Sequence, residues 1–280
     1  MPASVTPLTR LIPCTGERLP AVGLGTWPAF DLRGAGADRA ALKDALRTLV
    51  DQGGTMVDSS PMYGAAESVV GALAGELELE GKLFIATKVW TSGREAGIRQ
   101  MEDSFRKLRV ERLDLMQVHN LLDADTHLAT LAAWRREGRV RYVGVTHYHA
   151  GAHAALEAAI RKHRPDFVQL NYSLAEPDAE RRLLGVAEGE GIAVIVNRPA
   201  AGGAMFARVR GKPLPDWARE IDCSSWTQFF LKFVLGHPAV TCVIPGTRNA
   251  AHVAGNAAAA HGRLPDPALR KRMAAYFDSL

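Results

Sequence analysis

Cysteine is scarce in this sequence, and its three copies are far apart. Cys14, Cys223 and Cys242 are distributed over 280 residues, and no two of them have a CxxC spacing. A disulfide framework needs an even set of cysteines, and a structural zinc site needs clustered ones. We therefore expect neither, and we expect a reduced, intracellular chain. A core of this size needs no cross-link to fold.

Long apolar runs are also missing. No stretch approaches the roughly 20 apolar residues of a membrane-spanning helix. The segment Met1–Pro13 lacks the apolar centre of a signal peptide. These two absences predict a cytoplasmic protein without a membrane partner.

Neither sign of charge is in large excess. The chain has 34 Lys and Arg against 30 Asp and Glu, a net charge of +4. Arginine pairs such as Arg135-Arg136 fall in predicted helices with carboxylates nearby, which is typical of solvated outer faces. Nucleic acid is therefore not an expected partner.

Short apolar runs alternate with helical patterns along almost the whole chain. The runs are rich in Val, Ile, Leu and Met and do not alternate strictly with polar residues, as expected of strands buried on both faces. We predict strands at Ala21–Thr26, Thr55–Ser59, Leu83–Lys88, Leu113–Val118, Val140–Thr146, Phe167–Asn171, Ala193–Asn197 and Thr241–Ile244. We predict helices at Arg39–Asp51, Glu67–Leu79, Ile98–Leu108, Thr126–Glu137, Ala152–His163, Ala179–Glu190, Ser225–Leu235 and Pro267–Phe277.

Eight strands that each precede a helical pattern predict a (β/α)8 TIM barrel, in one domain over residues 1–280. A short β-hairpin is expected before it, within Leu11–Leu19. Gly202–Asp222 is expected to be a long rim loop and the alanine-rich Asn256–Gly262 a helix.

Local capping signals fit this division of the chain. Glycines follow four of the predicted helices, where a left-handed residue ends a helix. Ser224 or Ser225, and Asp178, are predicted helix N-caps.

Four ionisable side chains are predicted at one rim of this barrel. Asp58 and Lys88 end two strands, His119 follows a third, and Tyr63 lies in the loop after Asp58. In such barrels the active site forms at the carboxyl ends of the strands. A Lys ammonium lowers the pKa of a neighbouring tyrosine, and an Asp carboxylate keeps that Lys charged. These four side chains can supply a proton and stabilise charge, but none of them can supply electrons. The hydride must therefore come from a cofactor.

These residues lie in motifs that resemble the aldo-keto reductase family. The motifs have the order and spacing of that family from the hairpin to Asn256: Gly23–Trp27, Val57–Gly64, Ala86–Trp90, Leu113–His119, Gln169–Ser173 and Ile244–Arg248. The resemblance implies NADPH-dependent reduction of a small aldehyde or ketone, with NADH as a possible alternative. Tyr63 would be the general acid, Lys88 would lower its pKa, Asp58 would pair with Lys88, and His119 would position the carbonyl.

The resemblance also implies a cofactor site and a substrate pocket. Thr146, His147 and Gln169 would hold the nicotinamide carboxamide. The other implied cofactor residues are Thr26, Trp27, Asn197, Arg198, Pro199, Ile244, Gly246, Thr247, Arg248, His252 and Asn256. Trp27, Trp90 and Asn120 would line the substrate pocket, with Phe30 as a further rim aromatic; core packing is the other interpretation of these aromatic residues.

Several positions depart from the family pattern. Asn197 aligns with an aromatic residue that stacks on the nicotinamide in many members. Gly246 and His252 align with a lysine and an arginine, and Gly255 with a glutamate. Arg248 remains as a partner for the 2′-phosphate, because guanidinium pairs bidentately with phosphate; a solvated loop arginine is the alternative.

Three other hypotheses stay open. The chain could be a non-catalytic NADP-binding barrel, or an aldolase that forms a Schiff base on Lys88. His149 and His153 are four residues apart, like two metal ligands on one helix face, but no glutamate or third ligand accompanies them at a useful spacing, so no metal is predicted. A Rossmann fold is disfavoured because no GxGxxG follows an early strand. The oligomeric state is not indicated.

Overall fold

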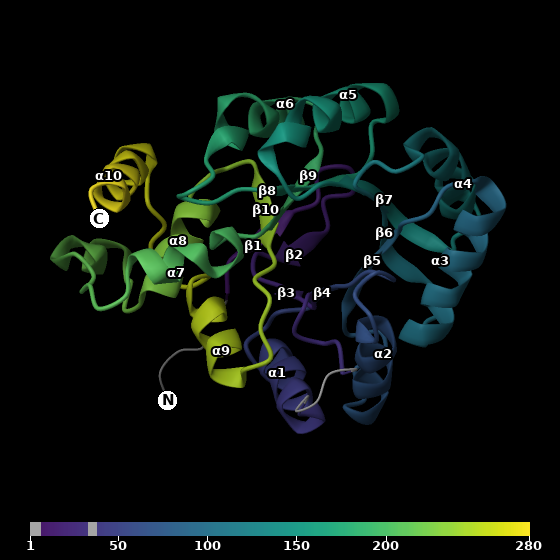
Figure 1. The fold of residues 1–280 in the computed structure, drawn as a ribbon, viewed down its shortest axis with the longest axis horizontal. Coiled ribbons are helices and arrows are strands. Elements are labelled where there is room, and N and C mark those ends of the chain that lie inside the picture. Colours follow the sequence, from purple (N-terminus) through teal and green to yellow (C-terminus); the bar gives the residue numbers. More distant parts are fainter. Residues whose placement is uncertain (1–6, 33–37) are drawn as a thin grey trace.

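The protein forms a nearly closed barrel of parallel strands surrounded by helices (Figure 1). The computed structural model describes residues 7–32 and 38–280. Its main sheet has the order β10-β9-β8-β7-β6-β5-β4-β3. Parallel bridges Val22–Val243 and Gly25–Gly246 bring the first and last strands together. The predicted (β/α)8 class is confirmed.

The strands are short and lie close to their predicted positions. They are β3 (Leu24–Gly25), β4 (Met56–Asp58), β5 (Phe84–Val89), β6 (Leu113–His119), β7 (Val140–Thr146), β8 (Phe167–Asn171), β9 (Ala193–Asn197) and β10 (Val240–Val243). The helices are α1 (Arg39–Asp51), α2 (Ala66–Glu76), α3 (Arg94–Leu108), α4 (Ala124–Arg136), α5 (His153–His163), α6 (Leu183–Gly189), α7 (Ala204–Arg208), α8 (Trp226–Leu235), α9 (Ala250–Ala258) and α10 (Pro267–Asp278).

The predicted N-terminal hairpin is present. β1 (Thr9–Leu11) and β2 (Arg18–Pro20) pair antiparallel. Ile12 and Leu19 are buried in one apolar cluster with side chains from inside the barrel. The hairpin therefore closes the amino-terminal end of the barrel with its own apolar side chains. Residues 1–6 of the segment analysed for a signal peptide lie outside the described residues.

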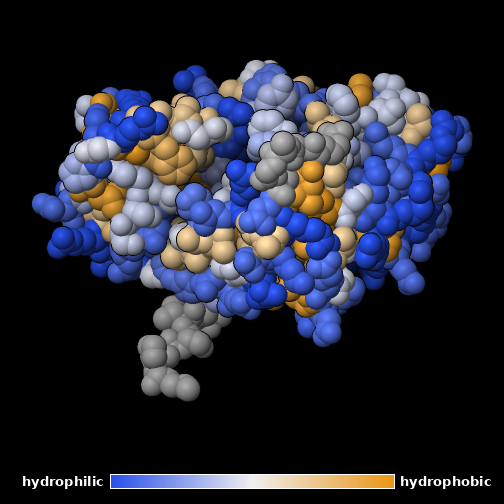
Figure 2. Space-filling model, turned by 60° about the horizontal axis from the view of Figure 1, so that its bottom comes forward, coloured by the Kyte–Doolittle hydropathy of each residue, from blue (hydrophilic) through white to orange (hydrophobic). Residues whose placement is uncertain are grey.

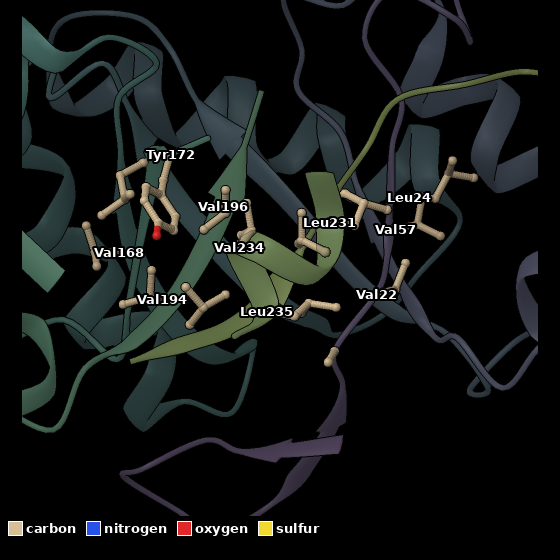
Figure 3. Close-up of a cluster of buried hydrophobic side chains, with 14 of the residues drawn as sticks. Val22, Leu24, Val57, Val168, Tyr172, Val194, Val196, Leu231, Val234 and Leu235 are labelled. Atoms are coloured by element: carbon tan, nitrogen blue, oxygen red, sulfur yellow. The ribbon is translucent and has the colours of Figure 1, made fainter. Parts of the chain in front are cut away.

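Two apolar cores follow from the two faces of the strands. Alternate residues face the barrel interior and pack with the hairpin. The other set packs outward against the helices; Figure 3 shows part of this outer core, with valines of β8 and β9 and leucines of α8. The outer surface in Figure 2 is mostly hydrophilic, as expected of amphipathic helices around such a core.

Most local signals agree with the structure. Four glycines that follow predicted helices have the expected left-handed φ angles, Gly53 at 79°, Gly81 at 73°, Gly138 at 76° and Gly191 at 68°. Ser225 is an N-cap, because its side chain accepts a hydrogen bond from the Gln228 N–H.

Three local predictions were wrong. Gly202–Asp222 contains α7 and a 3₁₀ helix, Asp216–Ile221, instead of being an open loop, because buried Met205 and Ile221 pack into the outer core. The alanine-rich helix begins at Ala250 and ends at Ala258, since Asn249 caps its N-terminus. Asp178 is not a cap and is instead the first residue of a short 3₁₀ helix, Asp178–Arg181.

Candidate functional site

The carboxyl-terminal end of the barrel interior is polar, in contrast to the apolar layers beneath it. Along β5 the inward positions run from Phe84 through Ala86 to Lys88, and the first two belong to the inner apolar cluster. The same period of two places polar side chains at the ends of the neighbouring strands. This polar layer contains Asp58, Lys88, Gln117, His119, Thr146, Gln169 and Asn197.

Lys88 is fully buried and remains charged. Its Nζ donates to Asp58 Oδ2 over 2.5 Å and to the Ser59 carbonyl oxygen over 2.6 Å. Burial by itself would lower the pKa of this lysine, but the negative charge of Asp58 and the proximity of Tyr63 reverse that effect and raise the pKa. The predicted pairing of Asp58 with Lys88 is therefore present as a buried ion pair.

The second oxygen of Asp58 is held by two glutamines. Asp58 Oδ1 accepts from Gln117 Nε2 at 3.1 Å and from Gln169 Nε2 at 2.9 Å. The sequence analysis did not identify Gln117. A polar residue inside an otherwise apolar buried strand, two positions before His119, was the available signal, since an unpaired buried amide is costly.

Tyr63 lies against the ammonium group of Lys88. The lysine Nζ is 5.0 Å from the centre of the tyrosine ring. Burial raises the pKa of the Tyr63 hydroxyl, and Lys88 opposes that rise without cancelling it. The lysine thus acts in the predicted direction, but the net shift of the tyrosine pKa is upward. Tyr63 is protonated at neutral pH.

His119 is a buried, neutral imidazole beside Tyr63. Burial, with the nearby charge of Lys88, lowers its pKa to about 3. Its Nδ1 lies 3.1 Å from Ser60 Oγ, and its ring meets the Tyr63 ring edge-on at 5.9 Å between centres. Ser60 was also missed by the sequence analysis. At neutral pH this histidine can donate one N–H and accept at its other nitrogen.

The ends of β7, β8 and β9 are joined through Gln169. Its Oε1 accepts from Thr146 Oγ1 at 3.2 Å and from Asn197 Nδ2 at 3.3 Å. Asn197 also donates to the His147 carbonyl oxygen at 3.0 Å, whereas its own Oδ1 is buried and has no hydrogen-bond partner among the described residues. The structure thus brings together Thr146, His147, Gln169 and Asn197 next to Asp58.

The segment after β10 has little room for side chains. A Cβ on Gly246 would stand 2.7 Å from the Trp27 carbonyl oxygen. Thr247 Oγ1 lies 3.4 Å from His252 Nδ1, and Asn249 accepts from the first backbone N–H groups of α9. Arg248 is exposed and has no polar partner in the described part of the chain.

The other predicted cofactor residues are spread around the rim. Thr26 is buried and its hydroxyl donates to the Asp58 carbonyl oxygen at 3.0 Å. Arg198 has a positive φ of 51° and lies 3.8 Å from a Glu176 oxygen. Ile244 and Asn256 are buried. Pro199, which follows Arg198, is buried as well.

Two of the predicted pocket aromatics are exposed. Trp27 is 58% exposed and Trp90 is 41% exposed. Trp90 also contacts His119, with 6.5 Å between ring centres. The core-packing interpretation is therefore wrong for Trp27 and Trp90. It is right for Phe30, which is fully buried. Asn120 is half-buried, has a φ of 53°, and its buried Oδ1 lacks a hydrogen-bond partner within the described ranges.

The histidines that follow β7 contact one another or other side chains of the protein. The rings of His147 and His149 lie 4.3 Å apart, and His153 Nε2 pairs with Asn171 Oδ1 at 3.0 Å. Among residues 7–32 and 38–280, no group of three potential ligands could hold a metal ion. Within the same ranges, no helix has the length and apolarity needed to cross a bilayer.

Comparison with known proteins identifies the class of protein that this fold and site define. The model of the aldo/keto reductase family matches residues 21–271, so the chain belongs to this family. The methylglyoxal reductase YeaE of Escherichia coli is 29% identical over 259 residues, 89% of this chain and 88% of that protein. The aldo-keto reductase YhdN of Bacillus subtilis is 25% identical over 65% of this chain, but the match spans only 59% of YhdN.

Solved structures give the same result. An aldo/keto reductase from Klebsiella pneumoniae in complex with NADP and acetate has a TM-score of 0.76 and 25% identity, over 94% of this chain and 93% of that one. A second one from Klebsiella pneumoniae, in complex with NADPH, has a TM-score of 0.75 and 27% identity, over 94% and 92%. The predicted family and the oxidoreductase class that it implies are confirmed.

Proposed function

We propose that this protein reduces a small aldehyde or ketone to the alcohol with NADPH, and that Tyr63 is the general acid. The single observation that carries the proposal is the charged, fully buried Lys88 beneath the Tyr63 ring. A buried ammonium at this place favours the tyrosinate left after proton transfer. Asp58 keeps that ammonium charged.

The chain's own groups account for the proton and the orientation of the substrate. Tyr63 starts protonated and gives its proton to the developing alkoxide. The tyrosinate charge is then balanced by Lys88, 5.0 Å from the ring centre. Neutral His119 has an N–H with which to hold the carbonyl oxygen. The nicotinamide supplies the hydride when it is bound.

The rim residues fit a dinucleotide. We infer that Thr146, His147 and Gln169 hold the nicotinamide carboxamide. The buried Oδ1 of Asn197, which has no hydrogen-bond partner among the described residues, is an unused acceptor in that layer. Ile244 to Asn256 would hold the adenosine. Arg248 has no ion-pair partner among the described residues and lies next to the capped N-terminus of α9, an arrangement that suits a phosphate.

For the substrate, the relatives give a first candidate. YeaE is a methylglyoxal reductase, and it aligns with most of this chain. We therefore infer that a small 2-oxoaldehyde is a suitable starting substrate, in a panel with aromatic aldehydes for the exposed Trp27 and Trp90.

Tyr63→Phe tests the mechanism. The variant should lose most of its turnover, by about 100-fold or more, because it lacks only the proton donor. Its NADPH affinity, measured by quenching of tryptophan fluorescence, should stay within about twofold of wild type. Phe206→Leu, a change at an exposed aromatic residue outside the polar layer, is the matched control. A Tyr63→Phe enzyme with near-normal rate would refute the assignment.

Two alternatives are less well supported. A Lys88 aldolase needs an uncharged lysine as nucleophile, whereas the ion pair with Asp58 keeps Lys88 protonated. A non-catalytic NADP-binding barrel is favoured by the departures at Asn197, Gly246 and His252. Tight NADPH binding without turnover across the aldehyde panel would support it.

A further inference from the structure

A cavity of about 460 Å³ opens at the end of the barrel opposite to the polar layer. It lies between the hairpin β1–β2, α2 and the segments that lead into β5 and β6. Thr55, Asp114 and Arg141 line it from the amino-terminal ends of their strands. The predicted catalytic side chains stand at the carboxyl ends, so this cavity is separate from them.

The wall of the cavity is apolar. Leu19 of the hairpin, Val70 of α2, and Leu79, Leu83 and Leu108 beside them line it, and each of these side chains is buried in the cores. A volume of this size lies within the usual range of about 300–1,000 Å³ for small-molecule sites. The cavity can therefore cover an apolar body of a few carbon rings or a short aliphatic chain.

The acidic groups in the cavity are largely neutralised. Arg141 donates to Asp114 Oδ1 at 2.6 Å and also to a carboxylate oxygen of Glu17. The Tyr142 hydroxyl donates to the same Glu17 oxygen at 2.6 Å. These two carboxylates are thus occupied by protein donors.

The cations at the mouth of the cavity are not neutralised. Lys82, Arg109 and Arg112 are exposed, and none has an ion-pair partner among the described residues. Arg18 makes one hydrogen bond, from Nε to Thr9 Oγ1 at 3.0 Å. Among the residues that line the cavity, these four cations face one carboxylate without an ion-pair partner in the described ranges, Glu80. The mouth therefore carries an excess of positive charge over an apolar wall.

We propose that this cavity binds a small organic anion, with its carboxylate or sulfonate at Lys82 and Arg112 and its apolar body against the leucine wall. Burial of the ligand's apolar body supplies the affinity, and the cations at the mouth select ligands of negative charge. The site is independent of NADPH and of the reaction proposed above.

The test uses anilinonaphthalene sulfonate, an amphipathic anion whose fluorescence rises in apolar surroundings. The full-length protein is titrated with and without saturating NADPH. Saturable binding is expected in both cases, because the two sites lie at opposite ends of the barrel. Trp90→Ala, a change at the other end, should leave the Kd unchanged.

A charge-matched pair of double variants localises the binding. Lys82→Glu with Arg112→Glu should raise the Kd at least about tenfold. Arg210→Glu with Lys271→Glu changes the net charge equally at two exposed positions outside the cavity that have no ion-pair partner in the described part of the chain, and should change the Kd by less than about twofold. Circular dichroism and the thermal midpoint check that all variants fold.

Three outcomes would overturn the proposal. Equal weakening in both double variants would mean general charge attraction. Displacement of the probe by NADPH, with no effect of the cavity variant, would place the probe at the catalytic end. No saturable binding would mean that the cavity takes no such anion. None of these outcomes bears on the proposed reductase activity.

Discussion

At the scale of single residues, the buried ion pair of Lys88 and Asp58 is a costly feature of this molecule. Two charges taken out of water are tolerated only where their remaining hydrogen-bonding capacity is satisfied. Both oxygens of Asp58 have donors, from Lys88 on one side and from Gln117 and Gln169 on the other. The two glutamines are therefore part of what makes the Lys88–Asp58 pair possible.

Gln117→Leu tests this dependence. It keeps the side-chain size but removes one donor from Asp58 Oδ1, so it should lower the free energy of unfolding by about 1–3 kcal/mol. Urea denaturation measures the change. Gln52→Leu, at an exposed position after α1, is the control and should lie near zero. A Gln117→Leu protein as stable as wild type would show that Gln169 alone satisfies the carboxylate.

Glu67 is a second buried acid, on α2 behind the barrel. It is 2% exposed; its Oε1 accepts from Thr87 Oγ1 at 2.6 Å, and its Oε2 has no hydrogen-bond partner among the described residues. Burial raises its pKa above the usual 4.5. A raised carboxyl pKa stabilises the fold below the unfolded-state value, and this contribution is lost as pH rises through the folded-state value.

Glu67→Gln should therefore be more stable than wild type at pH 8, and the advantage should shrink toward pH 4. The amide keeps the acceptor for Thr87 and cannot ionise. Thermal unfolding of the variant and the wild type across this pH range measures the difference in stability. Glu76→Gln, on the same helix, should be less stable than wild type at pH 8, because the exposed Glu76 carboxylate pairs with Arg39 and its pKa is lowered from 4.5 to about 2. This deficit should persist down to pH 4.5 and shrink only as pH falls further toward 2. An advantage independent of pH would contradict the assignment.

At the scale of elements, glycines set how closely the first and last strands approach. A Cβ on Gly25 would stand 2.8 Å from the Ile244 carbonyl oxygen, and one on Gly246 would stand 2.7 Å from the Trp27 carbonyl oxygen. Both neighbours are backbone atoms, which cannot rotate away. The family lysine has no room at Gly246 unless this backbone shifts.

Gly25→Ala should consequently destabilise the protein by about 1–3 kcal/mol, because β3 and β10 must separate. Gly185→Ala is the matched control: it lies in α6 with open space around its Cβ, and should stabilise by up to about 1 kcal/mol. Urea denaturation compares the two. Equal effects of the two substitutions would show that the barrel seam is adaptable.

The bounds of the helices and strands show which elements local sequence patterns predict and which they do not. β7, β8, β9 and α1 have the predicted bounds, because apolar runs and glycine or aspartate boundaries are local signals. The start of α9 and the helices within Gly202–Asp222 were missed. Prolines and glycines lie around the short helices of Gly202–Asp222 and obscure their pattern, whereas contacts with distant parts of the outer core stabilise them.

At the scale of the whole molecule, a dinucleotide bound at the rim should increase the free energy of unfolding of the whole protein. A ligand that binds only the folded state stabilises it by mass action, by about 2.7 kcal/mol at a concentration of 100 Kd. NADPH should raise the Tm by several degrees, and NADH should raise it less at the same concentration. Differential scanning fluorimetry gives both values.

Arg248→Ala should reduce the NADPH-induced rise to that seen with NADH, because only NADPH carries the 2′-phosphate. Arg210→Ala removes another exposed arginine, one without an ion-pair partner within residues 7–32 and 38–280, and should leave both rises unchanged. If Arg248→Ala lowered both rises equally, the 2′-phosphate assignment would be wrong. The one-domain organisation stays a prediction, and a single thermal transition is what it requires.

The sequence alone determined the repeat of strands and helices, the family, and the end of the barrel at which Asp58, Tyr63, Lys88 and His119 stand. These features are written in local periodicity and in motif spacing. The tertiary structure decided the rest. It raised the pKa of Tyr63 through burial, brought Gln117 and Ser60 into hydrogen bonds with Asp58 and His119, and placed exposed cations around a cavity at the far end. Burial, hydrogen-bond partners and cavities depend on residues far apart in the chain, and they exist only after the barrel has closed.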